Sequence, residues 1–322
     1  MIQAKFKNNY FKTQLRNVKK HKSLIPFLMP AALFTLVFSY IPMMGIAFAF
    51  LGPEFDLIRG PVLYNLFNSS LTLQNFTVIF DDPIFWRAIG NTLAISGIRL
   101  LLIFPLSIFI AIQLSELRSS ALAKFVLIVI CLPNFFSWAV VIGLWTGLLN
   151  AQGGALNEIL IALRIIPPNY PLLQQDYLFR PFVIFFQAWR GAGWGSILFY
   201  AAIVSIDKTY YEAARIDGAN KLQRIIHLTI PSILPTVALM LVLAISGIMD
   251  AGFEQIWTMM QNSAQFVETQ VILGTYIFQL SVVDRTNIPF ATALGVFNGL
   301  IALTLMLGGN FITRRSLKRG LW

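Results

Sequence analysis

The chain has 322 residues, of which 57% are hydrophobic and only 12% are charged, and its formal net charge is +10. Soluble domains carry about 25% charged residues, so half of that value excludes an ordinary soluble domain and predicts a protein that crosses a membrane several times. The single cysteine, Cys131, excludes an internal disulfide and lies in an apolar run, which favours a small buried side chain. The excess of positive charge could indicate a nucleic-acid partner or a membrane topology, and its distribution along the chain decides between them.

Residues 1–23 form a basic arm without any acidic residue. Such an arm could bind nucleic acid, begin a signal peptide or fix the orientation of a first span. Residues 24–50 follow without a charge. This run is longer than the roughly 7–15 residues of a secretory apolar region and sufficient for a span of about 20 residues. We therefore expect a cytoplasmic arm followed by an uncleaved first transmembrane helix.

Five further apolar runs predict five more spans. They cover about residues 89–114, 122–149, 182–206, 233–256 and 291–312, and a basic tail follows at 313–322. With six spans, both termini, the turn near Arg118 and the loop at 207–231 lie on one side, which holds all ten lysines and seven of the fourteen arginines. Positive charge marks the cytoplasmic side. The sequence thus predicts an all-α, polytopic membrane protein with both termini in the cytoplasm, whose charge requires no nucleic acid.

The loop at residues 207–231, which we call the elbow, is the longest charged passage inside this apolar sequence. Asp207 is a typical N-cap residue, which predicts a short helix after it. Gly218 is expected to end that helix in the left-handed conformation. A second helix should then run over residues 219–230 until Pro231 and Pro235 end it. A helix–glycine–helix elbow at a membrane surface is suited to binding another protein, and it has no group suited to catalysis.

Residues suited to catalysis are scarce. The only histidines are His21 and His227, so zinc-ligand spacing is absent from the sequence. No glycine is followed by lysine, which excludes a Walker A phosphate loop. The run at residues 191–195 is rich in glycine but lies inside a predicted span, where close helix packing or a weakened helix beside a pathway explains it better. We therefore expect no enzyme, no metal and no cofactor in this chain; if ATP drives it, another chain hydrolyses the ATP.

Charged residues inside the predicted spans are the candidates for a solute pathway. Arg99 lies in the second span and Arg190 in the fourth, whereas Asp250 and Glu254 lie one turn apart in the outer part of the fifth. A charge at the bilayer centre costs about 2.5–3.5 kcal/mol on insertion scales. These residues should therefore either form an internal ion pair or line a polar path for a hydroxylated or anionic solute. Nearby aromatic residues could stack on sugar rings or simply fill the membrane: Trp189, Trp194, Phe253 and Trp257.

The elbow resembles the EAA loop of ATP-binding-cassette (ABC) importer permeases. The family pattern is Glu-Ala-Ala, three residues, glycine, nine residues, and then an apolar residue, any residue, leucine and proline. Here Glu212-Ala213-Ala214 leads to Gly218, and Leu228-Thr229-Ile230-Pro231 follows at the same spacing, with isoleucine in place of leucine. The resemblance continues over residues 89–312, which look like the core of carbohydrate importer permeases, including Asp250, Phe253 and Thr275-Tyr276-Ile277-Phe278. The opening run with Tyr40-Ile41-Pro42-Met43 and the closing Gly320-Leu321-Trp322 resemble the permeases that serve oligosaccharides and polysaccharides, including those of bacterial alginate importers.

This resemblance implies a type I ABC importer permease fold in a bacterial cytoplasmic (inner) membrane. It also implies a second permease subunit as heterodimer partner, two cytoplasmic ATPase subunits that hold ATP and Mg, and a periplasmic or tethered solute-binding protein. The helix that contains Glu212, Ala213, Ala214, Asp217 and Gly218 would lie in a cleft of one ATPase subunit and transmit its closure to the fourth and fifth spans. The intramembrane charges leave one alternative open, an ion-coupled carrier that works without an ATPase. A membrane-bound enzyme is disfavoured because histidine, cysteine and clustered acids are scarce.

Overall fold

The computed structural model describes residues 25–52, 55, 64–65, 68–262, 268–285 and 287–317. Over these residues the regular structure is helical, apart from one isolated antiparallel bridge between Leu51 and Leu71. The prediction of an all-α protein is therefore confirmed for the described part of the chain. The basic arm at residues 1–23 and the last residues of the tail, 318–322, lie outside it.

The first apolar run consists of α2 (Ile25–Thr35), a π turn (Leu36–Tyr40), α3 (Ile41–Met43) and a 3-10 segment (Met44–Phe50). The remaining α-helices of the described chain are α5 (Gln74–Asp81), α6 (Pro83–Ser115), α7 (Ser120–Cys131), α8 (Trp138–Leu149), α9 (Ala155–Ala162), α10 (Asp176–Val204), α11 (Lys208–Ile216), α12 (Lys221–Arg224), α13 (Ile230–Ser246), α14 (Phe253–Asn262), α15 (Leu273–Phe278) and α16 (Ile288–Leu317).

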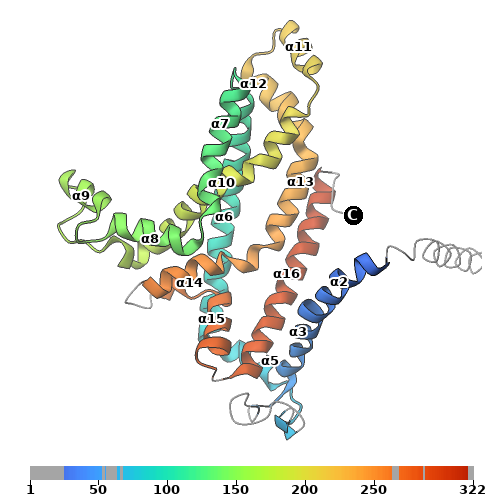
Figure 1. Ribbon diagram of the computed structural model, residues 1–322, viewed down its shortest axis with the longest axis vertical. Coiled ribbons are helices and arrows are strands. Elements are labelled where there is room, and N and C mark those ends of the chain that lie inside the picture. The colour runs from blue at the N-terminus through green and yellow to red at the C-terminus, as the bar shows by residue number, and fades with distance from the viewer. Residues whose placement is uncertain are drawn as a thin grey trace, which may run out of the picture.

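Four long helices set the shape of the molecule. Figure 1 shows α6, α13 and α16 running along its long axis and α10 crossing it obliquely, with α11 and α12 at one end, α5 and α15 toward the other, and α8 and α9 reaching out sideways. Helix α10 packs along α6, and α13 packs on α16. One apolar cluster joins α6, α10 and α13 near the elbow through Ala111, Phe199 and Ile233. A second joins α8, α10 and α14 through Val141, Phe186 and Ile256, so α10 belongs to both clusters.

Four helical segments of the described chain are long and apolar enough to cross a membrane, namely 26–50, 83–115, 221–261 and 288–315. The bent pair α7 and α8 would be a fifth if it counts as one span. The remaining predicted span, 182–206, lies in α10, a helix of 29 residues that also carries Asp176, Arg180 and Arg190. The multi-pass character predicted from composition therefore agrees with the helices of the structure.

The third predicted span, residues 122–149, is not one straight helix. Helix α7 ends at Cys131, a 3-10 turn with Pro133 follows, and α8 begins at Trp138 with its axis bent by 95° from that of the preceding segment. Proline has no N–H to continue the helical ladder. The Ser137 side chain then accepts the Val140 N–H at 3.4 Å and starts a new helix.

The expectation that Pro231 and Pro235 end a helix is wrong. Helix α12 continues through a π turn (Ile225–Thr229) directly into α13, which contains both prolines. A π turn is wider than an α turn, so it accommodates the missing N–H and the ring of a proline that follows. The break occurs instead between α13 and α14, where Ala251 and Gly252 have φ of 49° and 79°. Asp250 and Glu254, expected on one helical face, therefore lie on opposite sides of this break.

Candidate functional site

The first helix of the elbow begins as its sequence predicts. The Asp207 carboxylate accepts a hydrogen bond from the Thr209 N–H at 2.9 Å and caps α11. This backbone hydrogen bond stabilises the ionised carboxyl and lowers the pKa of Asp207 below its usual value. Helix α11 therefore starts at a fixed point, directly after α10.

The end of α11 also follows from its sequence. Gly218 has φ of 79°. Its N–H donates to the Arg215 carbonyl at 3.0 Å, and the Ala219 N–H donates to the Ala214 carbonyl at 2.9 Å. These two bonds form a Schellman motif, whose left-handed residue is usually glycine. The predicted glycine stop is confirmed.

Further contacts hold the helices of the elbow in a fixed arrangement. The side chain of Asn220 caps α12 in a reciprocal capping box with Gln223. The hydroxyls of Tyr211 and Thr229 lie 2.9 Å apart and join α11 to the π turn. The Lys221 ammonium lies 3.6 Å from the Glu116 carboxylate at the end of α6. The elbow is thus bound to itself and to α6.

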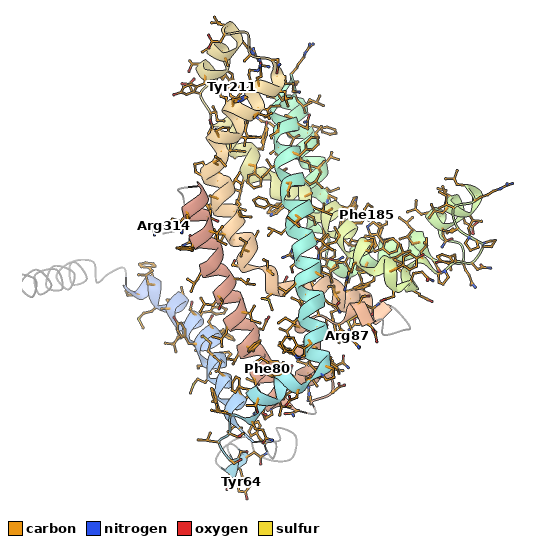
Figure 2. The ribbon with its side chains drawn as sticks, turned by 180° about the vertical axis from the view of Figure 1, so that it is seen from behind. Tyr64, Phe80, Arg87, Phe185, Tyr211 and Arg314 are labelled. Carbon is orange, nitrogen blue, oxygen red and sulfur yellow. The ribbon has the colours of Figure 1, made fainter. Side chains whose placement is uncertain are left out.

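The outer surface of the elbow exposes large apolar side chains. Ile216 is 86% exposed and Leu222 is 64% exposed. Of the predicted coupling residues, Glu212, Ala213, Asp217 and Gly218 are exposed and Ala214 is half-buried. Figure 2 shows Tyr211 at the end of the molecule opposite Tyr64. Exposed apolar side chains among charged ones are typical of a protein-contact surface.

A cavity of about 420 Å³ lies between α6, α10 and the break after α13, and we call it the central cavity. It is lined by three of the eight predicted pathway residues, Arg99, Arg190 and Asp250. These residues come from three elements far apart in the sequence, so the structure brings together charges that the sequence left scattered.

Arg190 holds the break between α7 and α8. Its Nε donates to the Phe136 carbonyl at 3.1 Å and its Nη2 donates to the Asn134 carbonyl at 3.3 Å. Its guanidinium also lies 4.5 Å from the centre of the Trp138 ring. The interrupted helix leaves these carbonyls without helical partners, and non-helical backbone at membrane depth needs such a donor. Arginine has five N–H donors, so others remain for the cavity.

Arg99 binds a backbone carbonyl at the second helix break, between α13 and α14. Its Nη2 donates to the Gly247 carbonyl at 3.0 Å, and the Ser96 hydroxyl donates to the Ile248 carbonyl. Among the described side chains, neither Arg99 nor Arg190 has a carboxylate within 4.0 Å. The internal ion pair that the sequence allowed is therefore not formed; carbonyls at helix breaks take its place.

Gln187 is the residue that sequence reasoning missed. It lines the central cavity and is 6% exposed, yet neither atom of its amide has a hydrogen-bond partner among the described residues. A Cβ on Gly252 would lie 2.4 Å from the Gln187 Nε2, so a larger residue there would force this amide to move. A buried amide without a protein partner costs stability, so a polar group that enters the cavity, from a solute or from water, would stabilise it. Its signal in the sequence was an amide three residues before Arg190 in an apolar run.

The other five predicted pathway residues lie outside the lining of this cavity. Trp189 packs on Trp145 with ring centres 5.6 Å apart, and Trp194 packs on Phe135 at 5.8 Å. Phe253 and Trp257 pack around Phe278 at 5.5 and 4.8 Å, and Glu254 lies in the first turn of α14. Their contact with a solute stays a prediction.

Residues 103–319 match the family described as binding-protein-dependent transport system inner membrane component. The chain belongs to this family. The permease is 31% identical over 317 residues to the polygalacturonan/rhamnogalacturonan transport system permease protein YteP of Bacillus subtilis (strain 168), a match that covers 98% of this chain and 95% of YteP.

Solved structures resemble the permease over nearly its whole length. A chain of a bacterial ABC transporter involved in the import of the acidic polysaccharide alginate is 33% identical, with a TM-score of 0.83, and covers 94% of this permease and 99% of its own length. A chain of a bacterial alginate ABC transporter in complex with an alginate pentasaccharide-bound periplasmic protein is also 33% identical, with a TM-score of 0.83, and the match covers 95% of this permease and 99% of that chain. The resemblance to ABC permeases of the carbohydrate type, drawn from the elbow, is confirmed.

Proposed function

We propose that this permease is the membrane subunit of an ATP-driven importer of oligosaccharides or polysaccharides, with acidic sugars as its substrate class. It would lie in a bacterial cytoplasmic membrane with six spans and both termini in the cytoplasm. A second permease, two ATPase subunits holding ATP and Mg, and a periplasmic or tethered solute-binding protein would complete the complex. The similarity to a permease named for polygalacturonan/rhamnogalacturonan transport and to an alginate transporter supports this proposal.

The geometry of the elbow is the observation on which the coupling mechanism rests. Helix α11 follows α10 after a short turn, and α12 continues without interruption into α13. A push on the exposed face around Glu212 would therefore move α10 and α13 together. Both helices line the central cavity, through Arg190 and Ala244. Closure of an ATPase on ATP would then change the cavity at a distance, as alternating access requires.

The chemistry of the central cavity suits an acidic sugar. Two guanidinium groups, Arg99 and Arg190, face one carboxylate, Asp250. The positive excess favours a uronate carboxylate, because arginine binds carboxylates through charge-assisted hydrogen bonds. The unpartnered amide of Gln187 can both donate to and accept from a sugar hydroxyl. An ion-coupled carrier is not favoured, because the two arginines already bind backbone carbonyls and the relatives are ABC permeases.

Uptake by the complete reconstituted transporter tests the proposal. ATP should drive uptake of alginate or galacturonate oligosaccharides into proteoliposomes, whereas a proton or sodium gradient should not. Glu212→Lys should abolish this uptake because it reverses the charge on the coupling face. Glu158→Lys is the matched control, since Glu158 is an exposed glutamate on the short helix α9, away from the elbow. Uptake driven by an ion gradient, or full uptake by Glu212→Lys, would overturn the assignment.

A further inference from the structure

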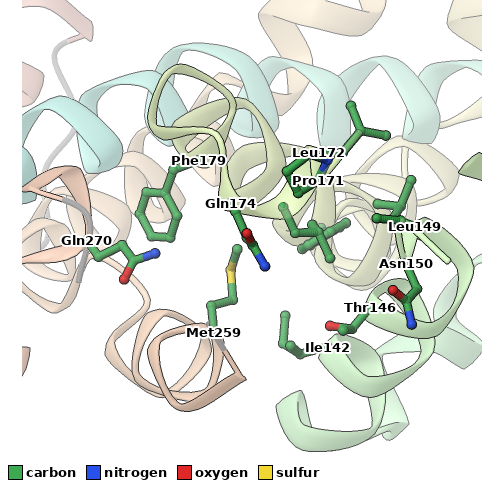
Figure 3. Close-up of a pocket in the computed structure, with 13 residues that line it drawn as sticks. Ile142, Thr146, Leu149, Asn150, Pro171, Leu172, Gln174, Phe179, Met259 and Gln270 are labelled. Carbon is green, nitrogen blue, oxygen red and sulfur yellow. The ribbon is translucent and has the colours of Figure 1, made fainter. Parts of the chain in front are cut away.

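A second cavity lies at the other end of α10, and we call it the outer cavity. It has a volume of about 210 Å³ and lies between α8, the turn before α9, the 3-10 turn Leu172–Gln174, α10, α14 and the 3-10 turn Glu268–Gln270 (Figure 3). Phe179, in the first turns of α10, belongs to its lining, whereas the elbow follows the last residue of that helix. The outer cavity and the elbow therefore lie at opposite ends of α10.

The lining of the outer cavity combines amides and a hydroxyl with aromatic rings. Its polar side chains are Thr146, Asn150, Gln174 and Gln270, and Phe179 is one of its two phenylalanines. Figure 3 shows the Gln174 amide and the Met259 side chain extending into the same space, with the Phe179 ring beside them. No charged side chain is among the described residues that line it. Amides and hydroxyls match sugar hydroxyls, and apolar walls match the C–H face of a sugar ring.

The walls of the outer cavity are held in place by side chains behind them. The Asn157 amide donates to the Leu149 carbonyl at 3.2 Å and to the Tyr170 carbonyl at 3.1 Å, which joins two parts of the rim. The Gln255 amide donates to the Val183 carbonyl at 3.1 Å and fixes α14 on α10. A cavity whose walls are fixed in this way loses little entropy when a ligand enters.

The outer and central cavities share their walls. Phe186 lines the outer cavity and Gln187, the next residue of α10, lines the central one. On α8, Ile142 of the outer cavity lies four residues after Trp138 of the central cavity, which is about 6 Å along the helix. The two cavities are therefore neighbours along α10 and α8.

We propose that the outer cavity is an entry subsite that holds one sugar ring through its hydroxyls before the chain reaches the central cavity. This inference rests on the proposed function. The volume equals that of about seven water molecules at roughly 30 Å³ each, which is the room of one pyranose ring with its hydroxyls. Because its lining carries no charge, the outer subsite accepts neutral and acidic rings alike, and selection by charge occurs at Arg99 and Arg190 of the central cavity.

Protection of engineered cysteines by a sugar tests the subsite. In the complete transporter with Cys131→Ala as background, Gln174→Cys places a thiol on the rim and Thr146→Cys places one deeper. The matched control is Gln152→Cys, an exposed position on the turn before α9 that is not part of the lining. The alginate trisaccharide is added at ten times its dissociation constant for the outer cavity, which leaves about one site in eleven empty. Labelling by a membrane-impermeant thiol reagent should therefore slow about elevenfold at both lining positions. Labelling at the control position should not change, and the protection should persist in high salt.

Three results would overturn the entry subsite. The first is that the trisaccharide protects neither lining cysteine, and the second is that it protects the control cysteine equally. The third is that the solute-binding protein without sugar gives the same protection. The last result would show that protein fills the cavity. ATP-dependent uptake is measured on the same membranes. Uptake without protection removes the subsite and leaves the proposed function, whereas absence of ATP-dependent uptake in the unsubstituted transporter counts against the proposed function itself.

Discussion

Substitutions at Gly218 separate the shape of the elbow from its contact with a partner. The residue has φ of 79°, and a Cβ built on it would meet no described atom within 4 Å. An L-residue in the left-handed region costs about 1–2 kcal/mol, which shifts the equilibrium away from the observed elbow about 5- to 30-fold. Gly218→Ala should therefore reduce ATP-dependent uptake several-fold, and Gly218→Asn should reduce it less, because asparagine tolerates this conformation.

The size of the new side chain reports on the partner. Within the chain, alanine and tryptophan at residue 218 meet the same backbone cost, since no described atom lies near the Cβ. Any additional loss with Gly218→Trp must come from a surface that covers the elbow in the complex. We expect Gly218→Trp to insert normally into the membrane. It should no longer copurify with the ATPase subunits, and ATP-dependent uptake should be lost.

Gly153 provides the matched control. It lies in the turn between α8 and α9 with φ of 77°, and a Cβ built on it would meet no described atom within 4 Å. Gly153→Trp carries the same strain and bulk and should keep the ATPase subunits bound. The elbow is not covered by the ATPase if Gly218→Trp copurifies with as much ATPase as Gly218→Ala does, or if Gly153→Trp releases the ATPase equally.

Other substitutions test the packing, the cap and the central cavity. A Cβ on Gly193 would lie 2.3 Å from the Ile130 carbonyl oxygen, so Gly193→Ala should lower the Tm in detergent through overpacking of about 1–3 kcal/mol, whereas Gly191→Ala, with no described atom within 4 Å, should not. The lowered pKa of Asp207 means that the ionised cap stabilises α11 above the ordinary aspartate pKa of about 3.9 and is lost as pH falls through the lowered value. Hydrogen exchange of α11 should therefore accelerate in acid relative to neutral pH, after correction for intrinsic rates, and Asp207→Asn should remove that dependence; an identical acid response in both proteins would contradict the cap. Gln187→Leu should raise the KM for alginate oligosaccharides about 2- to 13-fold, the equivalent of one hydrogen bond of about 0.5–1.5 kcal/mol, without lowering the Tm. An unchanged KM would remove Gln187 from the site.

The elbow shows how much local sequence can predict. In the structure its first helix, Lys208–Ile216, is capped by Asp207 and stopped by the left-handed Gly218, as the capping rules require. Capping depends on residues within one turn, so no other part of the chain is needed to place it. The stop expected at Pro231 was wrong because a π turn, which no single residue announces, carries the helix through.

The central cavity shows the limit of such prediction. Arg99, Arg190 and Asp250 were recognised as charges in apolar runs, and they do line one cavity. Their partners were not predictable, because the carbonyls of Asn134 and Gly247 become acceptors only where helices break. Gln187 escaped notice for the same reason: an amide in an apolar run becomes significant only when its surroundings leave it unpaired.

By itself, the sequence determined that the chain is an apolar helical protein with a polar, glycine-hinged elbow, since hydrophobicity, charge and caps act over a few residues at a time. Only the tertiary structure decided where α7 and α13 break, which arginine satisfies each break, and that two cavities lie in succession along α10. These features arise from contacts between helices that are distant in the sequence, and no local pattern records which carbonyl a guanidinium will meet.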